Sequence, residues 1–232
     1  MSNTVGSLEV PMILRARKRL YLSLTERQRE ILIGCVLGDA YISKLGKIRI
    51  EHSLKQCEYL AWKFSKLKTL CYRALPRNVI HKYKGKSYES SFFQLRQYFR
   101  KWRSIFYCNG QKIFPKNLIL SPLSVAIWYM DDGCWTGKKF VISTESFKGE
   151  YLIYLQNVLK KQFGLETNVS KNGKLTILKV SHLVFIDLIS PHIIPSMSYK
   201  LPNPVTTFPV VVPEGASSNM LANTLAPESI NT

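Results

Sequence analysis

Apolar and polar residues follow two different periods along this chain, and the periods alternate. A helix is expected to begin near Leu24, because Thr25 can act as its N-cap and Gln28 completes a capping box. Apolar residues then recur at helical spacing as far as Val36. Over residues 41–52 the period falls to two, which predicts two short strands around a turn.

The next part of the chain repeats this succession. Residues 54–71 have a helical period, residues 81–96 predict a hairpin that turns at Lys84-Gly85-Lys86, and residues 98–107 predict a short helix. The buried face of the helix at 54–71 is expected to consist of Cys57, Leu60, Ala61, Phe64, Leu67 and Leu70.

The same order of elements then occurs a second time. Helices are expected over residues 123–132, 150–163 and 182–189, and strands over 134–147. Asn172-Gly173 is a type I′ turn signal, which predicts a hairpin between the second and third of these helices. We therefore predict an α+β fold of two pseudo-symmetric αββαββα halves, with antiparallel strands forming a saddle around a central pair of helices.

Changes in composition and breaks in the apolar pattern divide the chain into five segments. The predicted segments are a basic N-terminal arm (1–22), a first half (23–114), a Pro-rich linker (115–122), a second half (123–203) and a C-terminal tail (204–232). Because both halves are present in one chain, we expect a monomer.

The first helix of each half ends in an aspartate, and small residues precede the first of them. Gly34 and Gly38 lie four residues apart, a spacing that allows another helix backbone to come close. If the two helices pack on this face, Asp39 and Asp132 lie side by side and repel unless a cation lies between them. Oxygen ligands favour Mg²⁺ over zinc, and divalent ions promote phosphodiester hydrolysis. The plainer interpretation of each aspartate is a solvated carboxylate at a helix end.

Charge limits the class of partner. The chain has 33 Lys and Arg against 15 Asp and Glu, a net charge of +18, which favours a polyanionic partner. Residues 1–110 have a net charge of +15 and residues 111–232 a net charge of +3. The alternative is a basic protein with no role at nucleic acids. Apolar stretches such as residues 31–38 are too short to cross a bilayer, so we expect no membrane association.

The five cysteines form no CxxC pair, which predicts neither a disulfide framework nor a zinc site and favours a reducing compartment. The strands and turns of both predicted sheets, in contrast, mix cations, aromatic rings and amides, the side chains that contact phosphates and base edges. The candidates for DNA contact are Lys44, Lys47, Arg49, Lys82, Tyr83, Lys84, Lys86, Tyr88, Gln94, Arg96, Lys138, Lys139, Lys171 and Lys174.

Two nine-residue segments resemble the motif of a known family. They read LIGCVLGDA at residues 32–40 and VAIWYMDDG at residues 125–133. Ile113-Phe114-Pro115 before the second copy and residues 199–203 (YKLPN) add matching context. On these residues the chain resembles the LAGLIDADG homing endonucleases, in their single-chain, two-motif branch, over residues 24–203. Motif one departs from the pattern at Gly38 and Ala40, but its aspartate is kept.

The resemblance implies a site-specific endonuclease that cuts both strands of a long, asymmetric double-stranded DNA target and leaves short 3′ overhangs. It implies Mg²⁺ as cofactor, with Mn²⁺ able to substitute, held by Asp39 and Asp132. It also places one catalytic basic residue in each half. These are Lys112, which lies 73 residues after Asp39, and Lys200, which lies 68 residues after Asp132.

Two other functions remain open for the same scaffold. One is an intron maturase, an RNA-binding splicing factor with intron RNA as a partner, and the other is a DNA-binding protein that does not cleave. Loss of an aspartate or a lysine would favour these alternatives, and all four residues are present. We expect an organellar location, in a mitochondrion or a chloroplast.

Overall fold

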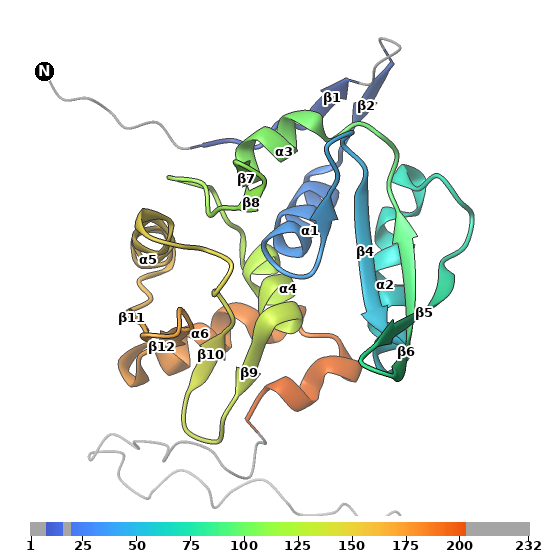
Figure 1. The fold of residues 1–232 in the computed structure, drawn as a ribbon. Coiled ribbons are helices and arrows are strands. Elements are labelled where there is room, and N and C mark those ends of the chain that lie inside the picture. The colour runs from blue at the N-terminus through green and yellow to red at the C-terminus, as the bar shows by residue number, and fades with distance from the viewer. Residues whose placement is uncertain (1–7, 16–19, 203–232) are drawn as a thin grey trace, which may run out of the picture. The chain divides into compact units, whose positions relative to one another are not determined.

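The first half of the chain has the predicted order of elements in our computed structural model, which describes residues 8–15 and 20–202 (Figure 1). Its elements are α1 (Glu26–Leu37), β3 (Tyr41–Ile42), β4 (Ile48–Ser53), α2 (Cys57–Leu67), β5 (Arg77–Tyr83), β6 (Lys86–Gln94) and α3 (Arg100–Phe106). Short 3₁₀ segments flank α2 on both sides.

The second half repeats this order. Its elements are α4 (Pro122–Asp132), β9 (Gly133–Trp135), β10 (Phe140–Ile142), α5 (Glu150–Phe163), β11 (Thr167–Val169), β12 (Leu175–Ile177) and α6 (His182–Ile189). Two small hairpins, β1 (Ile13–Arg15) with β2 (Tyr21–Ser23) and β7 (Tyr107–Cys108) with β8 (Gln111–Lys112), complete the described strands. The α+β class and the two αββαββα halves are confirmed.

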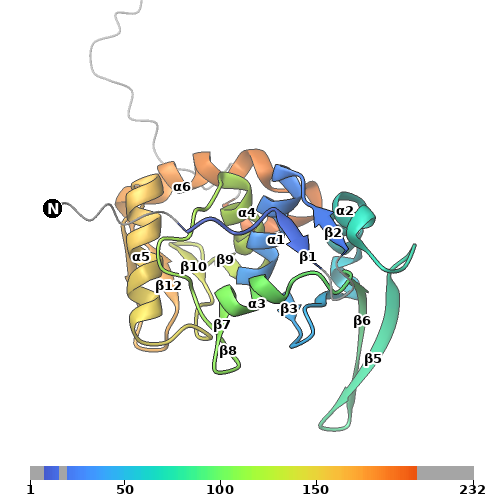
Figure 2. The same ribbon diagram turned by 90° about the horizontal axis from the view of Figure 1, so that it is seen from above.

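Each half contains one antiparallel four-stranded sheet, and the two sheets have the same topology. The strand orders are β3-β4-β6-β5 and β9-β10-β12-β11. Figures 1 and 2 show α1 and α4 side by side at the centre, with one sheet and α2 on one side and the other sheet with α5 and α6 on the opposite side. The pseudo-symmetry predicted from the sequence is therefore a property of the sheets as well as of the helix order.

The central helices pack on their small residues. A Cβ atom built on Gly34 would lie 2.6 Å from the backbone oxygen of Ser124 and 2.8 Å from Cβ of Ile127. The Ser124 hydroxyl also donates a 2.9 Å hydrogen bond to the carbonyl oxygen of Glu30. The predicted close approach of two helices at Gly34 is thus present, and the partner helix is α4.

Local signals explain where these two helices begin. Thr25 is the N-cap of α1 and forms the predicted capping box with Gln28, through two reciprocal hydrogen bonds of 3.2 Å. For α4 the N-cap is Ser121, which accepts from the Ser124 amide, and Pro122 occupies the first helical position.

One predicted turn is wrong in type. A type I′ turn needs positive φ at both central residues, but in the Asn172-Gly173 hairpin only Gly173 has it, at 78°. Ser170 accepts a 2.9 Å hydrogen bond from the Gly173 amide, so the loop is longer than two residues. The type I′ pattern occurs instead at Lys84 and Gly85, with φ values of 48° and 75°, in the β5–β6 hairpin.

The predicted N-terminal arm and linker pack against the rest of the molecule where the structure describes them. Val10 and Leu14 are 2 % and 1 % exposed, and the Trp102 indole donates to the carbonyl oxygen of Pro11. In the linker, Leu118 and Leu120 are buried. These apolar side chains cover surface that a detached arm and linker would leave in water. The predicted tail, 204–232, lies outside the described residues, and the five segment boundaries stay predictions.

The predicted buried face of the helix at 54–71 is confirmed at Leu60, Phe64, Leu67 and Leu70 and is wrong at its other two residues. Cys57 and Ala61 are exposed, whereas Tyr59 and Lys63 have no exposed surface. Helix α2 is rotated relative to the predicted orientation because Tyr59 and Lys63 both form polar contacts with other elements, described below. The five cysteines are free thiols. No helix among the described residues combines the length and the apolar character that a membrane span requires.

Candidate functional site

Asp39 and Asp132 lie at the ends of the two central helices. Helix α1 ends at Leu37 and Asp39 follows its C-cap, Gly38, whereas Asp132 is the last residue of α4. Burial raises the pKa of both carboxyls; Asp131 adds to the shift at Asp39, and Asp39 and Asp131 raise the pKa of Asp132 to about 7. The structure therefore brings the two aspartates within electrostatic range, and their role as metal ligands stays a prediction.

Two lysines bind the ends of the same helices. Lys112 Nζ donates to the carbonyl oxygens of Gly38 and Ala40, at 2.5 and 3.2 Å. Lys200 Nζ donates to those of Met130 and, at 3.1 Å, Asp131. Lys200 thus satisfies carbonyls in the last turn of α4, whereas Lys112 binds the C-cap carbonyl of α1 and one carbonyl beyond the helix. Both ammonium groups lie at the negative end of a helix dipole. Burial lowers the pKa of both lysines, and the neighbouring aspartates oppose this shift.

A third carboxylate, Asp131, is buried between the halves. Its side chain has no exposed surface. Oδ1 accepts hydrogen bonds from the Tyr59 hydroxyl at 2.8 Å and from Lys63 Nζ at 2.6 Å, and Oδ2 accepts from the backbone amide of Asp39 at 3.3 Å. Burial alone would lower the pKa of Lys63, but Asp131, together with Cys35 and Asp39, raises it by more, so the pKa is raised. Lys63 belongs to the first half and Asp131 to the second, so this ion pair crosses the interface.

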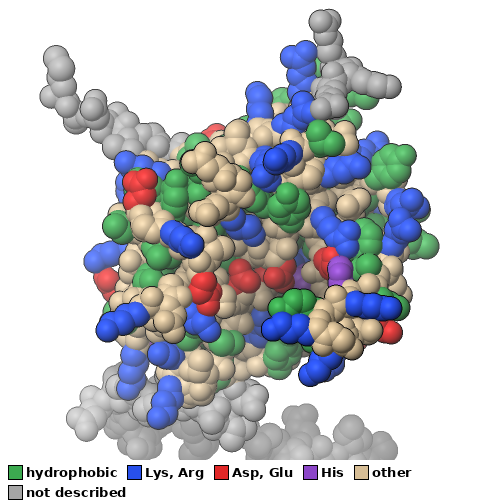
Figure 3. Space-filling model, viewed as in Figure 1, with side chains coloured by type: hydrophobic (Ala, Val, Ile, Leu, Met, Phe, Trp, Pro, Cys, Tyr) green, Lys and Arg blue, Asp and Glu red, His purple; other side chains and the backbone are tan. Residues whose placement is uncertain are grey.

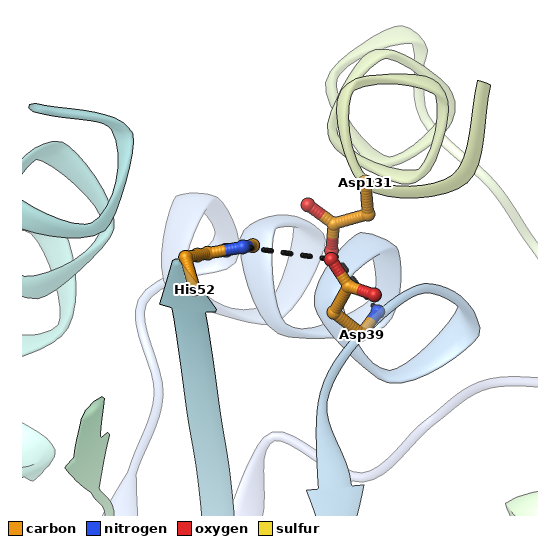
Figure 4. A group of neighbouring side chains, drawn as sticks. All are labelled: Asp39, His52 and Asp131. Atoms are coloured by element: carbon orange, nitrogen blue, oxygen red, sulfur yellow. Dashed lines mark hydrogen bonds and ion pairs between the residues drawn. The ribbon is translucent and has the colours of Figure 1, made fainter. Parts of the chain in front are cut away.

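His52 completes the cluster at the end of β4. It is 4 % exposed, its Nδ1 lies 3.5 Å from Oδ2 of Asp39, and its Nε2 lies 2.9 Å from Nζ of Lys63. Burial, with the Lys63 charge, lowers the pKa of His52 to about 4, so the ring is neutral at pH 7. Figure 4 shows His52 directed toward Asp39, with Asp131 approaching from α4.

Asp39, His52 and Asp131 each offer a ligand atom, and these atoms lie within 4.8 Å of one another. Of the three, only Asp39 is among the predicted site residues. The other residues of this cluster were not predicted from the sequence: His52, Tyr59, Lys63 and Asp131. A signal existed for Asp131, which directly precedes Asp132 at the position where motif one has Gly38.

The fourteen predicted DNA-contact residues all lie on strands of the two four-stranded sheets, on their turns or directly after them. Twelve are exposed, and Arg49 and Gln94 are half-buried. Arg49 already pairs with Glu51 at 2.6 Å and stacks over the ring of Phe92 at 3.5 Å. Lys and Arg side chains surround a group of acidic side chains near the middle of the face seen in Figure 3.

The chemistry of this arrangement suits a hard divalent cation. At the helix ends, carboxylate oxygens of Asp39 and Asp131 lie within 4.8 Å of each other, and burial, followed by the neighbouring carboxylates, raises the pKa of Asp39 and Asp132. Such oxygen donors fit Mg²⁺ or Mn²⁺. Exposed lysines on both sheets provide positive charge on either side of these carboxylates.

Comparison with known proteins gives matches in sequence and in structure over most of the chain. The model of the LAGLIDADG DNA endonuclease family matches residues 29–183. The chain is 30 % identical over 219 residues to a probable intron-encoded endonuclease 1 of Wickerhamomyces canadensis, which covers 82 % of this chain and 90 % of that protein. Among solved structures, the homing endonuclease I-WcaI bound to its DNA recognition sequence matches with a TM-score of 0.69 and 28 % identity, covering 78 % of this chain and 88 % of the other.

Other relatives are longer proteins. The chain is 32 % identical over 202 residues to the cytochrome b mRNA maturase bI2 of Saccharomyces cerevisiae, which covers 75 % of this chain and 47 % of the maturase. It is 28 % identical over 207 residues to the RecA protein of Mycobacterium shimoidei, covering 77 % of this chain and 47 % of that protein. The chain therefore spans about half the length of these relatives.

Proposed function

This chain belongs to the LAGLIDADG DNA endonuclease family, and from that membership we propose that it is a site-specific endonuclease that hydrolyses both strands of a double-stranded DNA target. The observation that carries the proposal is the position of Asp39 and Asp132. They lie at the ends of two packed helices, between two sheets whose strands and turns present exposed lysines.

In this proposal Asp39 and Asp132 hold the divalent cation. When bound, the cation supplies Lewis acidity toward the phosphodiester. The two carboxylates fix its place between the halves, because each is attached to the end of a helix whose position is set by packing on the other. Mg²⁺ is the expected cation, and Mn²⁺ is expected to substitute.

Lys112 and Lys200 place positive charge beside the carboxylates. Their ammonium groups are held by backbone carbonyls and not by salt bridges to the aspartates, so the carboxylate oxygens stay available to a cation. Fixed charges of this kind offset the negative charge that develops on a phosphodiester during hydrolysis. Both lysines are proposed as catalytic residues on this ground.

The target is proposed to be asymmetric and the protein a monomer. The two halves occupy each other's helix interface, so one chain already contains the paired site. They also differ in charge, at +15 for residues 1–110 and +3 for residues 111–232, which favours unequal contacts with the two sides of a target. The short 3′ overhangs and the organellar location stay predictions.

Neutralising the exposed hairpin lysines Lys82, Lys84 and Lys86 to Gln is expected to weaken binding to every DNA sequence. For each phosphate interaction that the substitutions remove, the slope of log K against log salt should fall by about 1. The measurement is a salt titration of binding with Lys160→Gln, Lys161→Gln on α5 as the control pair. An unchanged salt slope with altered preference at one base would show that the hairpin lysines read bases instead.

Divalent cations are expected to stabilise the protein more at pH 8 than at pH 5.5. The pKa of Asp132 is raised from 3.8 to about 7 in the folded state, so the folded state binds more protons than the unfolded one between these values. This contribution to stability is complete below about pH 4 and is lost as the pH rises through 7. A bound cation compensates the negative charge of Asp132 only at a pH where the carboxylate is ionised.

The measurement is the rise in Tm caused by Mg²⁺ at the two pH values, for the wild type and for Asp132→Asn. The variant should show a smaller rise at pH 8. Equal rises at both pH values in the wild type would contradict the assignment of Asp132 as a ligand.

A role in RNA splicing is the second candidate, because the chain is 32 % identical to a protein named as a cytochrome b mRNA maturase. The two functions are separated by one experiment. The purified protein is incubated with a plasmid library that contains the uninterrupted host allele and randomised targets, with Mg²⁺ or with EDTA. Linear product with Mg²⁺ alone supports the endonuclease. No linear product with Mg²⁺ or Mn²⁺, together with tight binding to intron RNA, would favour the maturase.

A further inference from the structure

Asp39 has a neighbour whose role can be assigned from hydrogen-bond donors and acceptors. The ring of His52 faces its carboxylate, with Nδ1 at 3.5 Å from Oδ2, near the long limit of a hydrogen bond (Figure 4). Two roles fit this position. His52 could bind the cation together with Asp39, or it could donate a hydrogen bond that holds Asp39 in place.

The position of Lys63 distinguishes between these two roles of His52. Its Nζ lies 2.9 Å from Nε2 of His52, 2.6 Å from Oδ1 of Asp131 and 4.1 Å from the centre of the Tyr59 ring, and the side chain has no exposed surface. An ammonium group has only donors, so Nε2 must accept. A neutral imidazole with an accepting Nε2 has its proton on Nδ1. That proton lies on the nitrogen nearest to the Asp39 carboxylate, and the Gln56 side chain is a further hydrogen-bond partner of the ring.

Binding of a cation by His52 conflicts with this contact. A metal-bound histidine normally donates its second N–H to a carboxylate or carbonyl oxygen. Here the second nitrogen is the acceptor of a buried ammonium, so a cation at Nδ1 would require a fully deprotonated ring or the loss of the hydrogen bond from Lys63. Asp131 is different, because a carboxylate has about four acceptor sites and its Oδ2 accepts one hydrogen bond, from the Asp39 amide at 3.3 Å.

We propose that His52 is a positioning residue that orients the carboxylate of Asp39 through its Nδ1–H, that Lys63 fixes this tautomer, and that His52 does not bind the cation. The proposal rests on the proposed function, because that function makes Asp39 a metal ligand. It deepens the function by giving the motif-one aspartate a dedicated donor, supplied from β4 and held by an ion pair to the other half.

Within the described part of the chain, this cluster has no symmetry-related second copy. The position in motif one that corresponds to Asp131 is Gly38, and a Cβ atom there would lie 2.5 Å from Cβ of Asp131. The absence of a side chain at Gly38 therefore leaves the space that the Asp131 side chain occupies. This accounts for the departure of motif one from the family pattern at Gly38.

The tautomer can be observed without any cleavage assay. Protein labelled with ¹⁵N at histidine is studied by long-range ¹H–¹⁵N correlation, and His52→Asn identifies the His52 signals by their loss. We expect an Nδ1–H tautomer for His52, with both ring nitrogens unchanged by saturating Mg²⁺. An Nε2–H tautomer, or a large Mg²⁺-dependent shift at Nδ1, would overturn the proposal.

Cleavage by a matched pair of variants tests the consequence for Asp39. Asn and Leu have nearly the same shape, but only Asn offers an N–H donor near the position of Nδ1. His52→Leu is expected to slow cleavage by about 10- to 100-fold, the usual effect of losing a group that orients a metal ligand, whereas His52→Asn should recover most of the rate. Both should bind DNA as the wild type does.

Ile50→Val on the buried face of β4 serves as the control for loss of packing alone, since it lowers Tm without removing a donor. If His52→Leu cleaves at the wild-type rate, or if His52→Leu and His52→Asn fall equally, His52 does not act as a donor. If His52→Leu does not fold, the tautomer measurement decides. A wild-type protein that cleaves no DNA would refute the proposed function instead, and the NMR result would still test the tautomer.

Discussion

Asp39→Asn and Asp132→Asn are each expected to slow double-strand cleavage by about 10³-fold while DNA binding is retained or strengthened. The cation is worth several kcal/mol of transition-state stabilisation in such reactions, and about 4 kcal/mol corresponds to this factor. Asparagine keeps the size of aspartate and one oxygen, but it removes the charge that attracts a cation. Removing a negative charge near phosphates also reduces repulsion toward DNA.

Folding is expected to survive both substitutions. Burial and neighbouring carboxylates raise the pKa of each aspartate, so the ionised groups are unfavourable in the folded protein when no cation is bound. The neutral amide removes that cost. Cleavage of supercoiled plasmid and gel-shift binding are measured in parallel, with Asp187→Asn on α6 as an exposed control for the same chemical change. Linearisation at full rate by either site variant would exclude that aspartate from the metal site.

Gly34→Ala is expected to destabilise the protein by about 1–3 kcal/mol. Helix propensity predicts the opposite sign, because alanine is about 1 kcal/mol more favourable than glycine within a helix. Packing outweighs propensity here, since the new Cβ would lie 2.6 Å from the backbone oxygen of Ser124 and 2.8 Å from Cβ of Ile127. Backbone cannot rotate away as a flexible side chain would, so α1 and α4 have to separate.

Denaturant unfolding measures this effect, with Arg27→Ala on the exposed first turn of α1 as the control for a change in propensity alone. Cleavage should also fall, because separation of the helices changes the distance between Asp39 and Asp132. An increase in the free energy of unfolding for Gly34→Ala would show that the helices do not pack at this residue.

The helices were largely predictable because local residues determine their ends. The Thr25–Gln28 capping box sets the start of α1, and the structure has the predicted bounds for α5 (Glu150–Phe163) and α6 (His182–Ile189). Turn geometry was harder. Asn172-Gly173 has the preferred sequence for a type I′ turn, yet the preferred backbone conformation occurs at Lys84 and Gly85, where the pairing of β5 with β6 leaves only two residues for the loop.

The carboxylates at the helix ends could be predicted because they depend on position along a helix. The buried cluster around Lys63 could not, because it depends on the packing of three elements. Asp39 and Asp132 could be predicted as site residues because each stands at the end of an apolar helix. Lys63 was missed because a lysine in a helix usually reaches water, and its burial depends on His52 from β4 and Asp131 from α4. The same contacts rotate α2, which is why Cys57 and Ala61 are exposed against prediction.

The ion pair between Lys63 and Asp131 makes the two halves non-interchangeable. Two copies of the first half would face each other with glycine at position 38 on both sides, and two buried lysines would have no carboxylate. Two copies of the second half would bring a pair of Asp131 side chains to a place where the structure has room for one. Duplicating either half therefore does not give a symmetric homodimer with this ion pair. A chimaera that joins one half of this chain to a half from another family member has to match Gly38 and Lys63 on one side with Asp131 on the other.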